Sequence, residues 1–257
     1  MPQHLLDRPE VLAVLFHPRR ESSSRAMAGV ELISVPVEPG VSVGGRLYRA
    51  RRESPIILYF HGNGEIAADY DDLAPLYTEM GITLLVMDYR GYGTSDGTPT
   101  ATNLIADAMA SYNALGRICD SNDLAPARRY LMGRSLGSAA ALEVASRVPD
   151  GIAGLIIVSG FANTFQLLAR LGLRISGASE ERDGAGNLAK INRIAARTLI
   201  IHGEEDFLIP ISEAEELYKH SGATENRLVR IPNAGHNDLM VVGMRQYFGA
   251  IRDFVRA

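Results

Sequence analysis

This sequence has a single cysteine, no long basic run and no long apolar run. Cys119 is the only cysteine among 257 residues, so neither an intrachain disulfide nor a zinc site built on cysteines can form. No long run of lysine and arginine occurs and the net charge is -4, which gives a nucleic-acid partner little electrostatic support. We therefore expect no nucleic-acid partner, and we interpret Cys119 as a structural or surface thiol.

Signals for membranes and export are also missing. The N-terminal stretch "MPQHLLDRPEVLAVLFHPRR" has no basic start followed by a long apolar run. Its apolar part, Val11–Phe16, is much shorter than the ~20 residues that span a bilayer. We expect no integral membrane segment and no secretory signal, and the expected location is the cytoplasm. The sequence carries no signal for the oligomeric state.

Cofactor motifs are the third absence. The glycine-rich "HGNGE" lacks the Gly-Lys-Ser/Thr ending of a phosphate loop, no intact G-x-G-x-x-G opens a helix, and H-E-x-x-H does not occur. We therefore expect no cofactor: no metal, no nucleotide and no flavin.

The apolar pattern predicts one α/β domain over residues 1–257. After a helix at about Asp7–Phe16, "VELISVPV" and "VSVGGRLYRA" form a predicted β-hairpin around Pro39-Gly40. Six short runs then follow that are apolar on both faces, as strands covered by helices on each side must be. These runs are Pro55–Phe60, Ile82–Tyr89, Arg128–Gly133, Gly154–Gly160, Arg197–Gly203 and Asn226–Pro232.

Helix-period stretches alternate with these runs. They are Glu65–Met80, Ala101–Leu115, Leu136–Arg147, Ser212–His220 and Leu239–Val255. The alternation predicts a mostly parallel central sheet with helices on both faces and the hairpin as an antiparallel edge. Residues 161–196 depart from the rhythm, because an apolar stretch, "FQLLARLGLRI", is followed by the polar "SGASEERDGAG". We interpret this insertion as a small lid over one end of the sheet.

The segment "LMGRSLGSAA" contains a G-x-S-x-G pattern, Gly133 to Gly137, between a predicted strand and a predicted helix. A sharp strand-to-helix turn would expose the Ser135 hydroxyl, and it needs small neighbours to avoid collision. The helix N-terminus would add unpaired N–H groups where an oxyanion forms. On the pentapeptide alone a turn serine without chemistry is the favoured interpretation, so its surroundings decide.

Three more loops follow strands and carry polar residues. "YFHGNGE" can aim the Asn63 backbone N–H at the same oxyanion as the Leu136 N–H, "IIHGEEDFLIP" exposes Asp206, and "IPNAGHND" carries His236. In a parallel sheet these loops emerge at the carboxyl edge, where ligands bind in open α/β folds. The chain order serine, acid, histidine is the order found in α/β-hydrolases.

The sequence resembles the α/β-hydrolases over most of its length, from about Ile33 to the C-terminus. Within that superfamily it is similar to the compact serine hydrolases grouped with prolyl-oligopeptidase-like and monoacylglycerol-lipase-like proteins. "HGNG", "DYRGYGTSDG", "GRSLG", "HGEEDFLIP" and "NAGHND" match the motifs of that group in order and spacing. The resemblance implies the α/β-hydrolase fold, Ser135 as nucleophile, His236 as base, Asp206 as acid, and Asn63 and Leu136 as oxyanion donors.

Other residues compete for these roles. Glu204, Glu205 and Asp238 are alternative acids, although Asp206 occupies the acid position of the motif. We interpret His61 and His202 as structural groups that bond loop backbone. We expect the remaining histidines, His4, His17 and His220, to be solvated. We expect Asp88, Arg90 and Asp96 of the "MDYRGYGTSDG" loop to lock that loop beside the site.

The predicted function is cleavage of carboxylic ester or thioester bonds in a small-molecule acyl ester, through an acyl-enzyme on Ser135. The alternatives are amide or peptide hydrolysis on the same fold, and a catalytically silent scaffold used for binding. For substrate binding we predict the lid residues Phe165, Leu168 and Leu171, which belong to an apolar set with Leu167, Leu173 and Ile175. The competing interpretation is that this set packs against the helices of the sheet.

Overall fold

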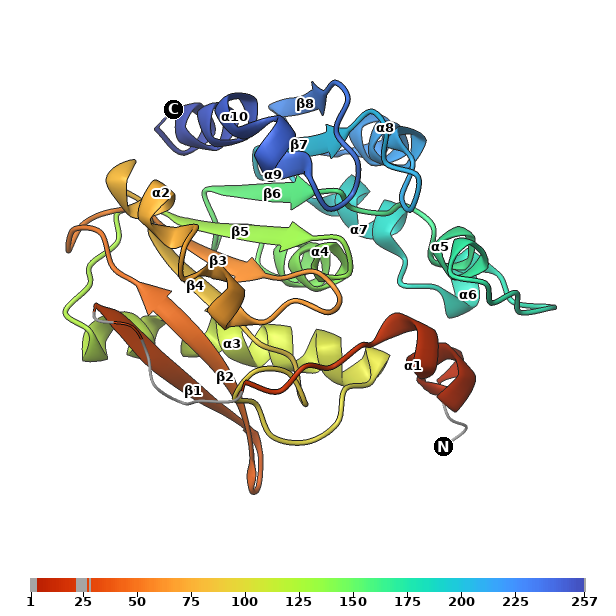
Figure 1. The fold of residues 1–257 in the computed structure, drawn as a ribbon, viewed down its shortest axis with the longest axis horizontal. Helices are drawn as coiled ribbons and strands as arrows, with labels where there is room; N and C mark the ends of the chain where they lie inside the picture. The colour runs from red at the N-terminus through yellow and green to blue at the C-terminus, as the bar shows by residue number, and fades with distance from the viewer. Residues whose placement is uncertain (1–3, 22–26, 28, 257) are drawn as a thin grey trace.

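An eight-stranded sheet forms the centre of the computed structural model, which describes residues 4–21, 27 and 29–256 (Figure 1). The strand order is β1-β2-β4-β3-β5-β6-β7-β8, in which β2 pairs antiparallel with β1 and β4 and all other neighbours are parallel. The predicted mostly parallel sheet with an antiparallel hairpin at its edge is confirmed. The strands are β1 (Val30–Glu38), β2 (Val41–Tyr48), β3 (Ile56–Phe60), β4 (Thr83–Met87), β5 (Arg129–Arg134), β6 (Gly154–Val158), β7 (Thr198–Gly203) and β8 (Asn226–Ile231).

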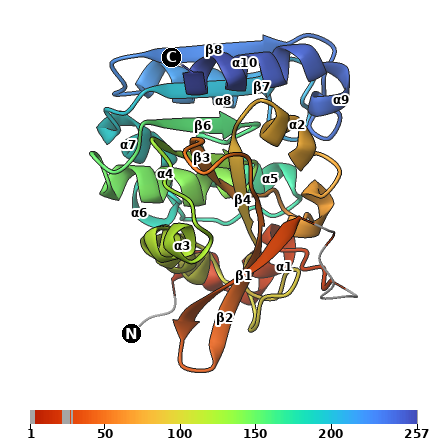
Figure 2. The ribbon, with the colours of Figure 1, turned by 90° about the vertical axis from the view of Figure 1, so that its left-hand side faces the viewer.

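Each central strand is buried on both faces because successive side chains enter two different cores. In β3, Ile56, Leu58 and Phe60 pack into one apolar cluster, while Ile57 and Tyr59 pack into the other. The first core lies under α3 (Ala101–Ser121), α4 (Gly137–Arg147), α7 (Asn187–Arg193) and α8 (Ile211–His220). The second lies under the 3-10 helix η2 (Ala67–Tyr70), α2 (Ala74–Glu79), α9 (Leu239–Val242) and α10 (Met244–Arg256). Figure 2 shows α3 and α4 to the left of the strands and α2 and α9 to the right.

Two predicted helices are interrupted, one at a proline and the other at a glycine that contacts a strand. The stretch predicted as Glu65–Met80 forms η2 and α2 separately, because Pro75 in the first turn of α2 lacks the N–H that a continuous helix would need there. The stretch predicted as Leu239–Val255 divides at Gly243, where an added Cβ would lie 2.3 Å from Ile231 Cγ2 of β8. The chain at Gly243 therefore passes too close to the sheet for any larger residue.

The N-terminal segment crosses the carboxyl edge of the sheet rather than lying apart from it. A 3-10 turn, η1 (Leu5–Asp7), precedes α1 (Pro9–Leu15), and Pro9 begins α1 as a first-turn proline. The chain then runs along the loop that follows β4, where Gly93 N–H donates to the Arg19 carbonyl at 2.8 Å. The predicted N-terminal helix is confirmed, with its first turn replaced by η1.

The predicted lid, residues 161–196, contains α5 (Thr164–Arg170), α6 (Glu180–Asp183) and α7. Its apolar set lies against the hydrophobic core: Leu167 and Leu168 are buried, and Phe165, Leu171, Leu173 and Ile175 pack against the core from outside. In the structure this apolar set thus packs against the body of the protein. That the segment acts as a lid within a single domain stays a prediction. No helix in the described ranges is long and apolar enough to cross a membrane.

Candidate active site

Ser135 lies at the junction between β5 and α4 in a backbone conformation that L-residues rarely adopt, with φ of 50°. The glycines on either side make this junction possible. A Cβ added to Gly133 would lie 2.3 Å from the Gly137 carbonyl oxygen, and one added to Gly137 would lie 2.1 Å from the Phe60 carbonyl oxygen. The backbones of β5, α4 and β3 therefore approach one another as only glycine permits. The G-x-S-x-G spacing follows from this crowding.

His236 and Asp206 lie beside Ser135, each on the loop that follows its strand. His236 Nδ1 is 2.7 Å from Asp206 Oδ2, and His236 Nε2 is 3.0 Å from Ser135 Oγ. Because a carboxylate only accepts, Nδ1 carries the proton, and Nε2 is left to accept from the serine hydroxyl. Asp206 Oδ1 accepts from the N–H groups of Leu208 at 3.0 Å and Ile209 at 2.7 Å, which holds the carboxylate in place.

The competing acids do not reach the ring of His236. Glu204 and Glu205 are exposed on the loop that carries Asp206. Asp238 is also exposed, and its Oδ1 accepts from the Gly235 N–H at 2.6 Å, within its own loop. Of the four carboxylates considered, only buried Asp206 is hydrogen-bonded to His236.

His61 and His202 are both buried and both contact loop backbone, as expected for structural histidines. His202 Nε2–H donates to the Ile209 carbonyl at 2.6 Å, and burial lowers the pKa of His202. His61 Nδ1 lies 2.8 Å from the Gly62 carbonyl oxygen, and its Nε2 lies 3.3 Å from Asp88 Oδ1. Burial lowers the pKa of His61, but the nearby Asp88 carboxylate outweighs burial and the net pKa is raised.

The two predicted oxyanion donors, Asn63 and Leu136, lie on the loops after β3 and β5. Within residues 4–21, 27 and 29–256, the backbone N–H of neither has a hydrogen-bond acceptor. The side chain of Asn63 is occupied instead, because its Oδ1 accepts from the Tyr92 hydroxyl and from the His17 N–H, both at 2.8 Å. The amide side chain thus anchors the loop, and its backbone N–H stays available.

Charged residues of the loop after β4 hold that loop in place, as predicted. Asp88 Oδ1 accepts from the Ala67 N–H at 2.8 Å, and Asp96 Oδ2 accepts from the Ser42 N–H at 3.0 Å. Buried Arg90 donates to Asp107 at 2.7 Å from Nε. These contacts are structural and fix the loop to β2, η2 and α3.

A buried ion pair that the sequence analysis missed connects three parts of the site. Arg134, the residue before Ser135, forms an ion pair with Glu65 through Nη1, and its Nη2 donates to the His236 carbonyl at 2.7 Å. Glu65 Oε2 accepts from the Gly62 N–H at 2.8 Å and from the Tyr70 hydroxyl at 2.7 Å. The sequence places one charged residue in each of the motifs "HGNGE" and "GRSLG", but no local pattern indicates that the two residues pair.

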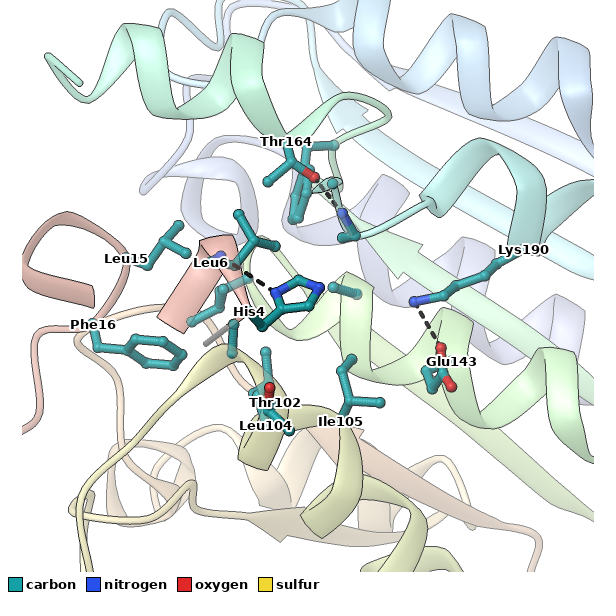
Figure 3. A pocket seen from close by; sticks show the side chains of 16 residues that line it. His4, Leu6, Leu15, Phe16, Thr102, Leu104, Ile105, Glu143, Thr164 and Lys190 are labelled. Carbon is teal, nitrogen blue, oxygen red and sulfur yellow. Dashed lines mark hydrogen bonds and ion pairs between the residues drawn. The ribbon is translucent and has the colours of Figure 1, made fainter. Parts of the chain in front are cut away.

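An apolar cavity of about 260 Å³ adjoins the residue after Ser135 (Figure 3). Leu136 and Ala139 contribute to its lining from the start of α4, and the other walls come from η1, α1, α3 and the segment after β6. The predicted lid contributes Phe161, Thr164, Gly184, Ala185 and Lys190 to the lining. Phe165, Leu168 and Leu171, which we predicted to bind substrate, are not among its lining residues, because they pack against the core.

No group of three or more His, Cys, Asp or Glu side chains in the described part of the chain is arranged to hold a metal ion. Cys119 is buried in the core at the end of α3, away from the residues above, and burial raises the pKa of its thiol.

The strand order, with the loops of Ser135, Asp206 and His236 at one edge of the sheet, is that of the α/β-hydrolase fold. A family model described as serine aminopeptidase, S33, matches residues 51–179. The chain belongs to this family of α/β-hydrolases and is a hydrolase, as the sequence predicts.

Similar proteins are known in bacteria, archaea and animals. The chain is 30% identical over 249 residues to the uncharacterised protein Rv2307c of Mycobacterium tuberculosis, covering 93% of this chain and 83% of the relative. It is 28% identical over 242 residues to alpha/beta hydrolase domain-containing protein 17C of Xenopus tropicalis, covering 91% and 72%. Among solved structures, the Pyrococcus furiosus esterase Pf2001 superposes with a TM-score of 0.74 at 18% identity, covering 93% of this chain and 98% of the esterase. At that identity the likeness shows a shared fold.

Proposed function

We propose that this chain hydrolyses carboxylic ester or thioester bonds of small molecules through an acyl-enzyme on Ser135. The observation that carries the proposal is the continuous chain of contacts from Ser135 Oγ to His236 Nε2 at 3.0 Å and from His236 Nδ1 to Asp206 Oδ2 at 2.7 Å. This is the arrangement that lets a neutral imidazole remove the serine proton while a buried carboxylate stabilises the imidazolium.

Each residue has a defined step in the proposed reaction. Ser135 Oγ attacks the acyl carbon as its proton passes to His236 Nε2, and the carbonyl oxygen becomes an oxyanion bound by the N–H groups of Asn63 and Leu136. The C–O or C–S bond then breaks, and His236 gives its proton to the leaving group. Water, deprotonated by His236, hydrolyses the Ser135 ester and regenerates the hydroxyl. Asp206 keeps the proton on Nδ1 throughout.

Two measurements test the proposal. The purified protein should hydrolyse p-nitrophenyl butyrate and should be labelled covalently by a fluorophosphonate probe, and Ser135→Ala should lose both. Retained labelling in Ser135→Ala would place the nucleophile elsewhere. Absence of both activities in the folded wild-type protein would favour a silent scaffold.

Hydrolysis of aminoacyl amides is the second candidate, because the matching family model is described as a serine aminopeptidase. An aminopeptidase must bind the free α-ammonium group of its substrate, and exposed Glu204 and Glu205 lie in the same loop as Asp206. Aminoacyl p-nitroanilides test this activity directly. A higher kcat/KM on them than on the matched p-nitrophenyl esters would replace the ester proposal.

A further inference from the structure

The cavity beside Ser135 follows one face of α4. Leu136, Ala139 and Glu143 all line it, and their spacing of three and then four residues places them in a row along that face. Leu136 is bonded directly to Ser135, so the cavity begins at the residue after the proposed nucleophile. It continues along α4 for the seven residues that separate Leu136 from Glu143, which is about 10 Å at the rise of an α-helix.

The opposite wall of the cavity is formed by segments far away in the sequence. Buried Leu6, Leu15 and Phe16 of the N-terminal segment face it together with Ile105 of α3 (Figure 3). This segment is also bonded to the oxyanion loop, since the His17 N–H donates to Asn63 Oδ1 at 2.8 Å. The N-terminal segment is therefore built into the site, and its apolar side chains make the cavity suited to hydrocarbon.

An ion pair limits the cavity at the Glu143 end. Lys190 Nζ lies 2.7 Å from Glu143 Oε2, and Arg147 Nε donates to the other oxygen at 2.5 Å. Burial raises the pKa of Glu143, but the two cations outweigh it and hold that pKa below its usual value. A hydrocarbon chain that reached this point would have to separate paired charges from each other, which is unfavourable. The Lys190–Glu143 pair thus closes the cavity at this end, and we call this pair the floor of the cavity.

Two dimensions give the size of a chain that would fit. A fully extended chain advances about 1.2 Å per bond, judged from the reach of an extended backbone, so about 10 Å takes about eight bonds. The volume of about 260 Å³ leaves room for a hydrocarbon chain of this length.

The position of His236 decides which part of the substrate enters. His236 must give its proton to the leaving group, so the leaving group lies on the side of the His236 loop. Among the described residues that line the cavity, none comes from that loop, 232–238. The acyl part, on the other side of the scissile bond, is the part that faces the cavity.

From these relationships we infer that the cavity binds the acyl chain of the substrate and that the preferred substrates carry an unbranched acyl group of about eight carbons. The inference rests on the proposed function of Ser135. The N-terminal segment and the Lys190–Glu143 pair, rather than the apolar set of α5, then determine which acyl groups are accepted.

The wild-type protein is tested first with p-nitrophenyl esters from acetate to palmitate, all with the same leaving group. We expect kcat/KM to rise severalfold for each pair of carbons up to about octanoate, because each buried methylene adds favourable transfer free energy. For acyl chains too long to fit above the Lys190–Glu143 pair, kcat/KM should fall. A profile without a maximum would overturn the inference.

Ile105→Trp then fills the cavity from α3, where the partial exposure of Ile105 leaves room for the larger ring to be accommodated without unfolding. The ratio of kcat/KM on octanoate to that on acetate should fall by about tenfold or more. Ala106→Trp is the matched control, since Ala106 is the next residue of α3, exposed and outside the cavity. It should keep the wild-type ratio.

Lys190→Ala removes the floor and should move the maximum in the opposite direction, toward decanoate and dodecanoate. Lys219→Ala is its control, because the Lys219 side chain is 72% exposed on α8 and should leave the profile unchanged. If both cavity variants keep the wild-type profile, the cavity does not hold the acyl chain. A second series, acetate esters of unbranched alcohols of increasing length, tests the opposite orientation: if Ile105→Trp lowers kcat/KM on the longer alcohols of this series instead, the cavity holds the leaving group and the inference is wrong.

These outcomes are separable from a failure of the proposed function. If the wild-type protein hydrolyses no ester and fluorophosphonate does not label Ser135, the proposed chemistry fails. If labelling and acetate hydrolysis are normal while chain length has no effect in any variant, only the assignment of the cavity fails.

Discussion

Arg134 Nη2 lies 2.7 Å from the carbonyl oxygen of His236, so the residue before the proposed nucleophile holds the loop of the proposed base. The same guanidinium pairs with Glu65, which accepts from the Gly62 N–H of the loop after β3, the loop that carries the proposed oxyanion donor Asn63. One buried ion pair therefore connects the three loops whose relative positions a hydrolase must keep within a fraction of an ångström. Burial and the Glu65 charge oppose each other on Arg134, and the net effect is a raised pKa, so the guanidinium stays charged.

Arg134→Met should lower kcat/KM by about 10- to 100-fold, because the His236 loop loses its tether while the proposed triad itself is intact. It should also lower the free energy of unfolding by about 2 kcal/mol, since Glu65 loses its partner but remains partly exposed. Ester hydrolysis, the rate of fluorophosphonate labelling and urea unfolding measure these effects.

The double variant Arg134→Met/Glu65→Gln separates positioning from stability. It removes the unpaired carboxylate, so much of the lost unfolding free energy should return, whereas the tether to His236 stays absent and activity should remain low. If activity recovers together with stability, Arg134 acts only through the fold and its role in positioning His236 is refuted.

The proposed triad should act as a unit. Ser135→Ala and His236→Ala should each lower turnover on the order of 10⁶-fold, and the double variant should be little worse, because removing either member already removes the whole pathway. Asp206→Asn should cost about 10⁴-fold, because an amide favours the wrong tautomer of His236. Glu205→Gln is the comparison within the same loop. If Glu205→Gln lost most of the turnover and Asp206→Asn lost little, the acid role would belong to Glu205.

The sheet and the meeting of Ser135, Asp206 and His236 could be predicted because their signals are local. A run such as Gly154–Val158 is apolar on both faces, and polar residues placed just after parallel strands must reach the same edge. The helix break at Gly243 depends on the approach of Ile231 from another strand, which no local pattern records.

The cavity and the Arg134 network could not be predicted for the same reason. Leu6, Ile105 and Lys190 are far apart in the sequence, and each by itself is an ordinary side chain of a helical segment. Whether the apolar residues after Phe161 line a cavity or contact the core was left open by the sequence, because hydrophobic periodicity does not tell the two apart. Only the tertiary structure distinguishes the two.

Gly137→Ala tests whether crowding at the strand-to-helix junction is needed for folding. The added Cβ would lie 2.1 Å from the Phe60 carbonyl oxygen and 2.7 Å from that of His61, and neither backbone can yield without moving the oxyanion loop. We expect a loss of about 3 kcal/mol in the free energy of unfolding, at the upper end for overpacked cores. Gly116→Ala in α3 is the control, with nothing within 4 Å of the new Cβ, and it should gain about 0.5–1 kcal/mol. Equal stability of the two variants would contradict the role given to Gly137.

His202 should make stability depend on pH in a definite direction. Burial lowers its pKa from an ordinary value of 6.5, although the Asp206 carboxylate and the Ile209 carbonyl act in the opposite sense. Below pH 6.5 the unfolded chain therefore takes up a proton that folded His202 does not, and the stability contributed by the neutral ring is lost as the pH falls. His202→Gln keeps a donor for the Ile209 carbonyl but does not titrate. The unfolding free energy of the wild type minus that of His202→Gln should thus be constant above pH 6.5 and shrink below it, by at most about 1.4 kcal/mol per pH unit.

His61 provides the opposite case within the same protein. Its net pKa is raised by Asp88 despite burial, so its contribution is complete below 6.5 and is lost as the pH rises through the raised pKa. Urea unfolding of the wild type, His202→Gln and His61→Gln between pH 5 and pH 8 measures both differences at once. The difference for His61→Gln should shrink toward high pH, while that for His202→Gln shrinks toward low pH. Slopes of the same sign for the two variants would show that one of the rings is held in a different protonation state from the one that its contacts indicate.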